Sequence, residues 1–240
     1  MAVSRTGNIY LLDKTGKQLD GWKPRTLDGS LDSPGFHIRV KGGDCIIALQ
    51  RNGILNVINR RGNMYPGFPI DLKAPSVSGV FVDIGNDFNS SRLITISTEG
   101  EIIEVNLKGK ILRREQLYKP GRESRFWLVP DALKKTFVIF RQEYNKVSVL
   151  DLKGKVIFEN NISSSSDLAA QYYNFSGDNQ VYVVIDTQQE FTYLFDKDGK
   201  SISFEPIESG FPIGLIYLSR DKTYRLYKNY NKNFSIETFN

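Results

Sequence analysis

The sequence predicts an all-β protein, a β-propeller of four-stranded antiparallel blades, with about five to six blades and ~45 residues per repeat. Three observations support this prediction. One hairpin motif recurs five times at a near-constant period, apolar positions recur within it, and two further apolar segments separate successive copies. Four short strands per period leave no room for helices. A sandwich or a barrel also uses short strands, but neither has to keep such a period.

The repeated motif is an Asp or Asn followed three residues later by a glycine. Successive glycines are separated by 46, 47, 45 and 45 residues. An Asp or Asn at the first turn position can accept a hydrogen bond from the backbone two residues on, and glycine supplies the positive φ that closes a tight turn. Each copy therefore predicts a strand, a turn and a second strand. The five pairs are Asp13 and Gly16, Asn59 and Gly62, Asn106 and Gly109, Asp151 and Gly154, and Asp196 and Gly199.

Apolar residues precede these turns and fill the segments between them. The residue before each Asp or Asn is always apolar: Leu12, Ile58, Val105, Leu150 and Phe195. Such columns are typical of strands buried between packed sheets. A strand just upstream of the next hairpin is expected at residues 45–49, 93–97, 137–140, 181–185 and 224–227. An innermost strand is expected at residues 36–40, 77–82, 126–129, 172–175 and 213–218.

The two ends of the chain do not match a whole number of blades. The N-terminus is expected to start near the third strand of a blade, and residues 231–240 to supply a sixth third strand, which makes roughly five and a half blades. Residues 1–240 are expected to form a single propeller domain, and this domain is expected to be an excised part of a longer chain. Three alternatives stay open: closure of six blades by both ends, a fragment of a larger propeller, or two chains that complete each other by self-association through the incomplete blade.

The composition of the chain excludes several kinds of site and segment. The 240 residues carry a mild net charge of +5, and the single cysteine, Cys45, excludes an internal disulfide and thiolate metal clusters. No segment has the ~18 apolar residues of a membrane span, and no signal peptide is visible. No catalytic grouping is recognisable, so neither enzymatic activity nor a cofactor nor a metal is expected.

Two family resemblances rest on particular residues. The stretch from Leu12 to Lys17, followed by Trp22, resembles the PQQ-like propeller repeat. Gly67-Phe68-Pro69, Gly210-Phe211-Pro212 and Gly21-Trp22-Lys23-Pro24 resemble the signature of bacterial integrin-like, FG-GAP-type propellers, which ends a blade's outer strand in that family. Both resemblances imply a propeller, and they favour an exported or cell-envelope bacterial protein, although the compartment stays undetermined. The Trp-Asp pair of WD repeats is absent from the sequence.

The turns are the first candidate binding site because they are rich in Lys and Arg. Ten of the chain's 32 basic residues lie there: Lys14, Lys17, Arg60, Arg61, Lys108, Lys110, Lys153, Lys155, Lys197 and Lys200. Charges on one rim attract phosphates, an acidic partner or anionic lipid. The alternative is that these residues only keep turns and edges soluble. Nucleic acid is not expected, because no aromatic residues interleave with the basic ones.

Three other candidate sites have structural alternatives. The segment from Asp83 to Asn89 offers oxygen ligands for calcium, or is simply a polar hairpin loop. His37, the only histidine, is expected to be a packed or edge residue. Five aromatic residues could stack on a sugar or peptide, or fill gaps between blades: Trp22, Tyr65, Phe68, Trp127 and Phe211.

Three functions follow from these observations. The leading hypothesis is a non-enzymatic scaffold or recognition module that binds a protein partner through a propeller face. The second is a carbohydrate-binding or cell-surface domain of a larger exported protein. The third is an enzyme with its site in the central funnel, which would need carboxylates on the innermost strands.

Overall fold

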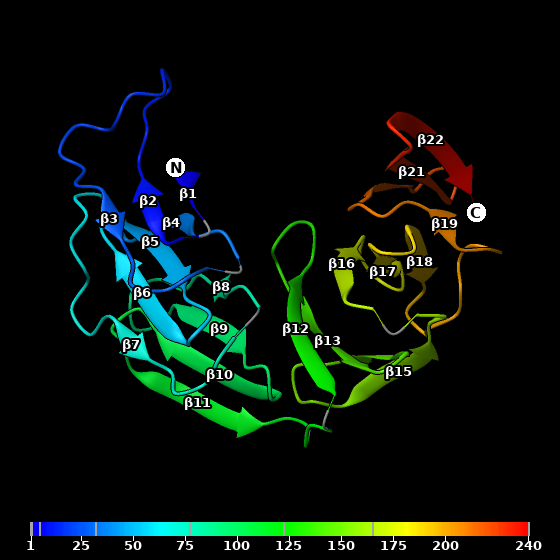
Figure 1. Ribbon diagram of the computed structural model, residues 1–240, viewed down its shortest axis with the longest axis horizontal. Helices are drawn as coiled ribbons and strands as arrows, with labels where there is room; N and C mark the ends of the chain where they lie inside the picture. Colours follow the sequence, from blue (N-terminus) through cyan, green and yellow to red (C-terminus); the bar gives the residue numbers. More distant parts are fainter. Residues whose placement is uncertain are drawn as a thin grey trace. The chain divides into compact units, whose positions relative to one another are not determined.

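The computed structural model describes residues 2–4, 6–31, 33–76, 78–121, 123–164 and 166–239 (Figure 1). The regular secondary structure of these residues consists of β-strands, arranged in antiparallel sheets whose strands follow one another in chain order. No helix long and apolar enough to cross a membrane occurs among them.

The first three sheets come from the N-terminal half. Sheet 1 contains β1 (Ala2–Val3), β2 (Asn8–Tyr10) and β3 (Arg25–Thr26). Sheet 2 contains β4 (Phe36–Val40), β5 (Gly43–Leu49), β6 (Ile54–Ile58) and β7 (Ile70–Asp71). Sheet 3 contains β8 (Phe81–Asp83), β9 (Arg92–Ile96), β10 (Glu101–Asn106) and β11 (Ile111–Gln116).

The other three sheets follow the same order. Sheet 4 contains β12 (Ser124–Pro130), β13 (Phe137–Glu143), β14 (Lys146–Leu150) and β15 (Val156–Asn161). Sheet 5 contains β16 (Leu168–Asn174), β17 (Gln180–Asp186), β18 (Phe191–Phe195) and β19 (Ile207–Glu208). Sheet 6 contains β20 (Gly214–Leu218), β21 (Thr223–Tyr230) and β22 (Asn233–Phe239).

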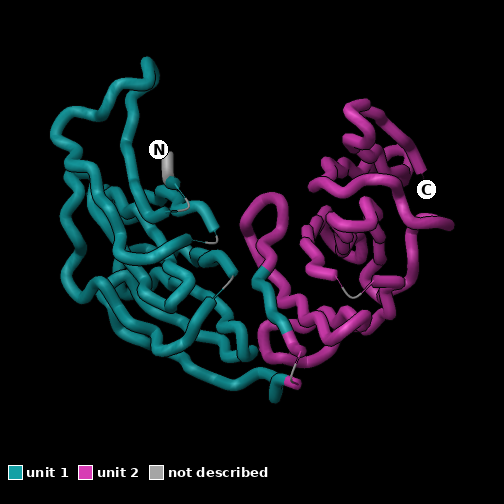
Figure 2. The backbone as a smooth tube through the Cα atoms, in the orientation of Figure 1, with its two compact units in different colours: residues 1–120, 125–128 teal, residues 121–124, 129–240 magenta. Residues whose placement is uncertain are grey.

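The chain divides into two compact units (Figure 2). The first comprises residues 1–120 and 125–128, and the second comprises residues 121–124 and 129–240. Sheets 1 to 3 therefore belong to the first unit, and sheets 5 and 6 to the second. The single-domain prediction for residues 1–240 stays a prediction.

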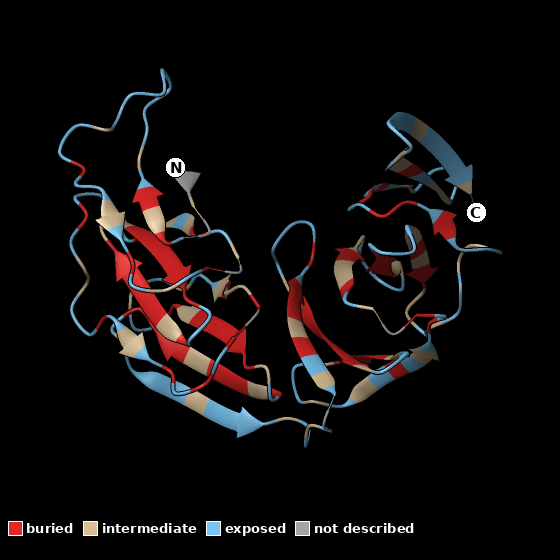
Figure 3. Cartoon of the chain, in the orientation of Figure 1, coloured by how far each residue is buried: buried red, intermediate tan, exposed pale blue. Residues whose placement is uncertain are grey.

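The second and third strands of each four-stranded sheet form its buried centre (Figure 3). In sheet 2, Ile46 and Ile58 lie opposite each other and pack with Ile9 and Trp22 of the sheet 1 region. The adjacent pair, Ile47 and Val57, faces the other way and packs with apolar residues of sheet 3. Both faces of the central strands are thus covered, which explains why these segments are apolar runs rather than alternating patterns.

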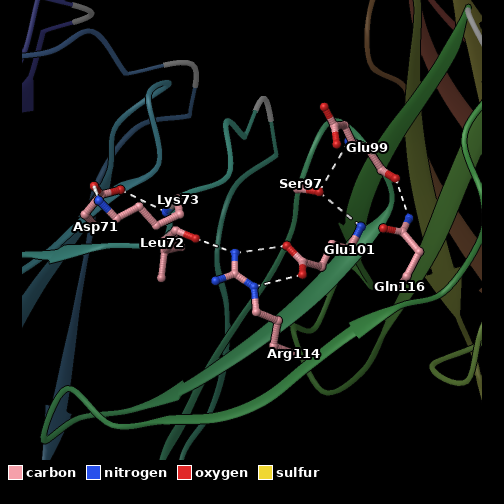
Figure 4. A network of polar contacts seen from close by, with 8 residues as sticks. All are labelled: Asp71, Leu72, Lys73, Ser97, Glu99, Glu101, Arg114 and Gln116. Atoms are coloured by element: carbon pink, nitrogen blue, oxygen red, sulfur yellow. Dashed lines mark hydrogen bonds and ion pairs between the residues drawn. The ribbon is translucent and has the colours of Figure 1, made fainter.

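The outer strands are more exposed and depend on polar contacts. Arg114 on β11 makes a two-pronged ion pair with Glu101 on β10, at 2.8 and 3.0 Å, and also donates to the main-chain oxygen of Leu72 at the end of sheet 2 (Figure 4). This guanidinium therefore joins the two outermost strands of sheet 3 to the preceding sheet. Gln116 adds a hydrogen bond to the Glu99 main-chain oxygen.

The predicted strands are confirmed. The inner strand at residues 36–40 has the predicted bounds, and the other predicted strands overlap an observed strand, although Val77 lies outside the described residues. The sixth third strand is confirmed as β22. The N-terminus starts near a third strand, as expected, because β2 leads into the first of the repeated turns, but the short strand β1 precedes β2 and pairs with it. Two residues were too few to stand out as a strand in the sequence.

The position expected of the Gly-aromatic-Pro segments, at the end of an outer strand, is wrong for two of the three and holds for Gly210-Phe211-Pro212. Gly67-Phe68-Pro69 precedes the outer strand β7 rather than ending it, and Gly21-Trp22 likewise precedes β3. Gly210-Phe211-Pro212 instead follows β19 and leads into β20. The copies therefore resemble one another in sequence without being structurally equivalent.

Candidate functional site

The five Asp/Asn-x-x-Gly segments form tight turns of one design. In each, a side-chain oxygen of the Asp or Asn accepts hydrogen bonds from the backbone N–H groups two and four residues on. In sheet 3, for example, Asn106 Oδ1 accepts from Lys108 at 3.1 Å and from Lys110 at 2.9 Å. The corresponding acceptors are Asp13, Asn59, Asp151 and Asp196. The predicted side-chain-to-backbone bond is confirmed, and it fixes the backbone from which the basic side chains project.

The turn glycines serve a second purpose that the sequence did not indicate. All five have φ between 78° and 84°, as a tight turn requires. In addition, a β-carbon on Gly62 would lie 2.7 Å from the Lys23 main-chain oxygen, and one on Gly199 would lie 2.5 Å from the Phe158 ring. These turns therefore pack closely against the outer segment of the preceding sheet. Gly16 in sheet 1 has no such neighbour within 4 Å.

The basic side chains on these turns are available to solvent. Of the ten predicted residues, all but Lys197 are exposed. Lys197 is half-buried and pairs with Asp198 at 3.1 Å. The other nine side chains have no ion-pair partner among the described residues.

The positive charge is concentrated on two of the five turns. The turns at residues 59–63 and 106–110 contain Asn rather than Asp, and each carries two basic residues and no acidic one. The turn at residues 196–200 contains two lysines and two aspartates and is electrically neutral. In the sheet 1 turn, hydrogen bonds from the Thr15 side chain and backbone hold the pKa of Asp13 below its ordinary value, so this carboxylate stays ionised.

Two further basic residues lie beside the turn of sheet 2, and the sequence analysis missed them. The Arg25 Nε donates to the main-chain oxygen of Gly62, and the Lys23 backbone packs against the same glycine. The sequence signal available for them was their position, with Arg25 in the outer strand β3 of the previous sheet and Lys23 just before it. We call the set Lys23, Arg25, Arg60, Arg61, Lys108 and Lys110, all in the first unit, the basic turn patch.

The other predicted sites have structural explanations. In the loop after β8, Asp87 Oδ1 accepts hydrogen bonds from the backbone of Asn89 and Ser90 and from the Ser90 hydroxyl, which lower the pKa of Asp87. His37 is half-exposed on β4 and contacts Asp44 at 2.9 Å. Cys45 is fully buried, and burial raises the pKa of its thiol.

The five candidate aromatic residues divide by burial. Trp22 and Phe68 are buried in the packing between sheets, whereas Tyr65 and Trp127 are half-buried. Phe211 is 60 % exposed. The gap-filling alternative is therefore confirmed for Trp22 and Phe68, and these two rings are not accessible to a sugar.

Strands, sheets and turns of this kind define a β-propeller protein, and similarity to solved structures establishes the class. The chain is similar to Saccharomyces cerevisiae Sqt1, with a TM-score of 0.62 and 14 % identity over 99 % of this chain and 69 % of that one. It is also similar to BBS1N, solved in complex with ARL6DN, with a TM-score of 0.59 and 13 % identity over 98 % and 73 % of the two chains. A Bacteroides caccae protein of unknown function gives a TM-score of 0.52 and 14 % identity over 96 % and 83 %.

No family model matches the chain, and no curated protein sequence matches it. The structural similarity confirms the propeller prediction. At these identities it establishes the fold alone.

Proposed function

We propose that this protein is a non-enzymatic recognition module that binds an acidic surface of a partner protein through the basic turn patch. The observation that carries the proposal is the presence of exposed cations, without ion-pair partners among the described residues, on turns whose backbone is already fixed. A fixed turn loses little conformational freedom on binding, so less of the interaction energy is spent on ordering.

Electrostatic magnitudes favour a partner that contacts several of these residues together. One exposed ion pair contributes about 0.2–1 kcal/mol, so a single lysine would not hold a partner. A cluster of uncompensated charges also accelerates the encounter with an oppositely charged surface. The basic turn patch contains six basic residues, and its two turns contain no acidic residue.

Two further considerations support a binding role over catalysis. The only cysteine, Cys45, is fully buried and so is not accessible as a nucleophile, and the only histidine, His37, lies on strand β4 with Asp44 as its partner. The similar propeller BBS1N was solved bound to a protein, ARL6DN. We extend protein binding to this chain as a proposal. Self-association through sheet 6 stays a separate prediction.

The experiment that tests this function uses a fluorescent poly-L-glutamate peptide as the acidic probe. Binding is followed by fluorescence anisotropy at about 50 mM and about 200 mM salt, because screening weakens contacts between exposed charges. We expect saturable binding that weakens at the higher salt concentration. Absence of binding at low salt would contradict the proposal. Tighter binding of a single-stranded oligonucleotide of equal charge would also contradict it, in favour of a nucleic-acid partner.

A further inference from the structure

A pocket of about 640 Å³ lies within the second unit and is lined by the segment at residues 202–208 and by residues of strands β21 and β22. Three glutamates and one lysine line it, Glu205, Glu208, Glu237 and Lys228, so the lining has a net charge of −2. The remaining wall is largely aromatic and aliphatic. The pocket contains none of the basic turn residues.

Glu205 occupies a position that two other sheets fill with a buried aromatic residue. In sheet 2, the Tyr65 backbone N–H donates back to the third strand, and Phe68, three residues later, packs into the core. Sheet 1 repeats this arrangement with Trp22. In sheet 5, Ile202 makes the equivalent backbone bond, and the residue three positions later is Glu205. The pocket therefore lies where an aromatic side chain would otherwise fill the space between two sheets.

Glu237 is the second departure from the repeat. Counted from the β21–β22 hairpin, it matches Leu150 of sheet 4, a position that is apolar in all five hairpin copies. Its carboxylate pairs with Lys228 at 2.8 Å, and the Lys228 side chain is only 12 % exposed. The charge of Glu237 is thus balanced within the protein. Glu205 and Glu208 form no ion pair within the described residues.

Aromatic side chains surround these carboxylates. Phe191 and Phe239 are half-buried in the wall, and Phe204 is fully exposed at the pocket. An aromatic face attracts a cation, and the attraction increases when water is displaced. A ligand that covers the exposed apolar surface of a phenylalanine beside the pocket also gains binding free energy, because that surface is removed from water. Unpaired carboxylates and aromatic rings together favour a ligand that is both cationic and flat.

We propose that this pocket binds an organic cation with a flat apolar body, the chemistry shared by an arginine side chain and by a small aromatic amidine. Its volume is in the range of small-ligand sites. The carboxylates of Glu205 and Glu208 contact the cation, and the phenylalanine rings cover its apolar part. This site differs from the basic turn patch in both charge and position along the chain, so it has its own ligand.

The test compares benzamidinium with benzamide, its uncharged analogue of nearly equal shape, by ligand-observed NMR and calorimetry on the full chain. We expect saturable binding of benzamidinium and at least tenfold weaker binding of benzamide. Equal binding of the two probes would overturn the proposal, because shape alone would then explain it. Absence of saturable binding of benzamidinium up to about 10 mM, beyond the weak end of the usual affinity range, would also overturn it.

Three variants link the binding to these residues. The double variant Glu205→Gln, Glu208→Gln keeps the shape and should weaken benzamidinium binding about tenfold, since each lost ion pair costs up to about fivefold. Glu205→Phe restores the aromatic residue of the other sheets and should abolish binding while leaving Tm unchanged or higher. Glu99→Gln, an exposed glutamate in the first unit, is the matched control and should have no effect. An unchanged affinity in the double variant would overturn the assignment.

A peptide arm distinguishes the two sources of the cation. The probe is a phenylalanine–arginine–phenylalanine tripeptide with blocked ends, compared with the same peptide containing uncharged citrulline. If the arginine peptide binds more tightly than benzamidinium, the ligand is a protein side chain. If benzamidinium binds more tightly, the ligand is a free small cation. Either result supports the shared chemistry, whereas equal binding of the citrulline peptide contradicts it.

Discussion

The main-chain oxygen of Gly67 lies 2.5 Å from the position that a β-carbon on Gly109 would take. The turn of sheet 3 therefore packs against the backbone of sheet 2 at a distance that only glycine permits. Gly67 is constrained in the same way, because its own β-carbon would lie 2.3 Å from the Lys108 main-chain oxygen. This contact anchors the turn that carries Lys108 and Lys110.

Replacing Gly109 should cost more than replacing Gly16. Both glycines have positive φ, 84° and 82°, but only Gly109 contacts another segment. Gly16→Ala should destabilise the protein by about 1 kcal/mol through the left-handed backbone alone, and Gly109→Ala by about 2–4 kcal/mol once the clash is added. Urea unfolding of both variants measures the difference. Equal losses of unfolding free energy in the two variants would mean that the close contact of Gly109 does not contribute to stability.

The two Gly-Phe-Pro segments should respond differently to the same substitution. Phe68 is 8 % exposed and packs between sheets 2 and 3, so Phe68→Ala should cost about 3–5 kcal/mol. Phe211 is 60 % exposed, and Phe211→Ala should cost less than about 1 kcal/mol. Denaturant midpoints of the two variants provide the measurement. A large loss at Phe211 would contradict the burial that distinguishes the two segments.

The ion pair between Arg114 and Glu101 should be measurable by a double-mutant cycle. The pair is two-pronged and about one-third exposed, so its coupling energy should be about 0.5–1 kcal/mol. Arg114→Lys keeps the charge but loses the planar two-pronged contact and the bond to Leu72, so this variant should be less stable than the unmodified protein. The cycle combines Arg114→Gln with Glu101→Gln, each of which removes the ion pair, and measures unfolding free energies. Full additivity of the two substitutions would contradict the coupling.

Asp13 should make stability depend on pH in the acid range. In the folded state, hydrogen bonds from Thr15 hold the pKa of Asp13 below its ordinary value of 3.8. Its contribution is therefore fully present above the unfolded-state pKa and is lost as pH falls through the lower folded-state value. Asp13→Asn keeps the acceptor oxygen, as Asn59 and Asn106 do in their turns, but cannot titrate.

The measurement for Asp13 is Tm between about pH 5 and pH 2, the range in which such a carboxylate titrates. We expect the Tm of the Asp13→Asn variant to fall less steeply than that of the unmodified protein. Parallel curves would show that the Asp13 carboxylate contributes nothing through its charge.

Local interactions explain why so much of this fold was predictable. The Asn106 turn needs only its own side chain, two backbone N–H groups and a glycine, all within five residues. The apolar run in β5 likewise indicates burial on both faces without knowledge of its neighbours.

Contacts between sheets explain what the sequence did not reveal. Gly16 and Gly109 have the same place in the motif, yet only Gly109 meets a neighbouring backbone. Arg25 joins the basic turn patch because it reaches Gly62, 37 residues away. Glu205 lines a pocket, and it has the position in sheet 5 that Phe68 has in sheet 2, where the aromatic ring fills the space. This equivalence becomes visible only when the two sheets are aligned by their backbone hydrogen bonds.

The most direct test of the proposed function compares two double variants in the poly-L-glutamate assay. Arg61→Gln with Lys108→Gln removes two charges from the basic turn patch. Lys119→Gln with Lys232→Gln removes two exposed charges outside these turns, from the connection after β11 and from the β21–β22 hairpin. We expect the first pair to weaken binding at low salt by about five- to twentyfold, as the loss of two ion pairs predicts, and the second by less than twofold. Equal effects of the two pairs would contradict the account, because the probe would then respond to net charge and not to the basic turn patch.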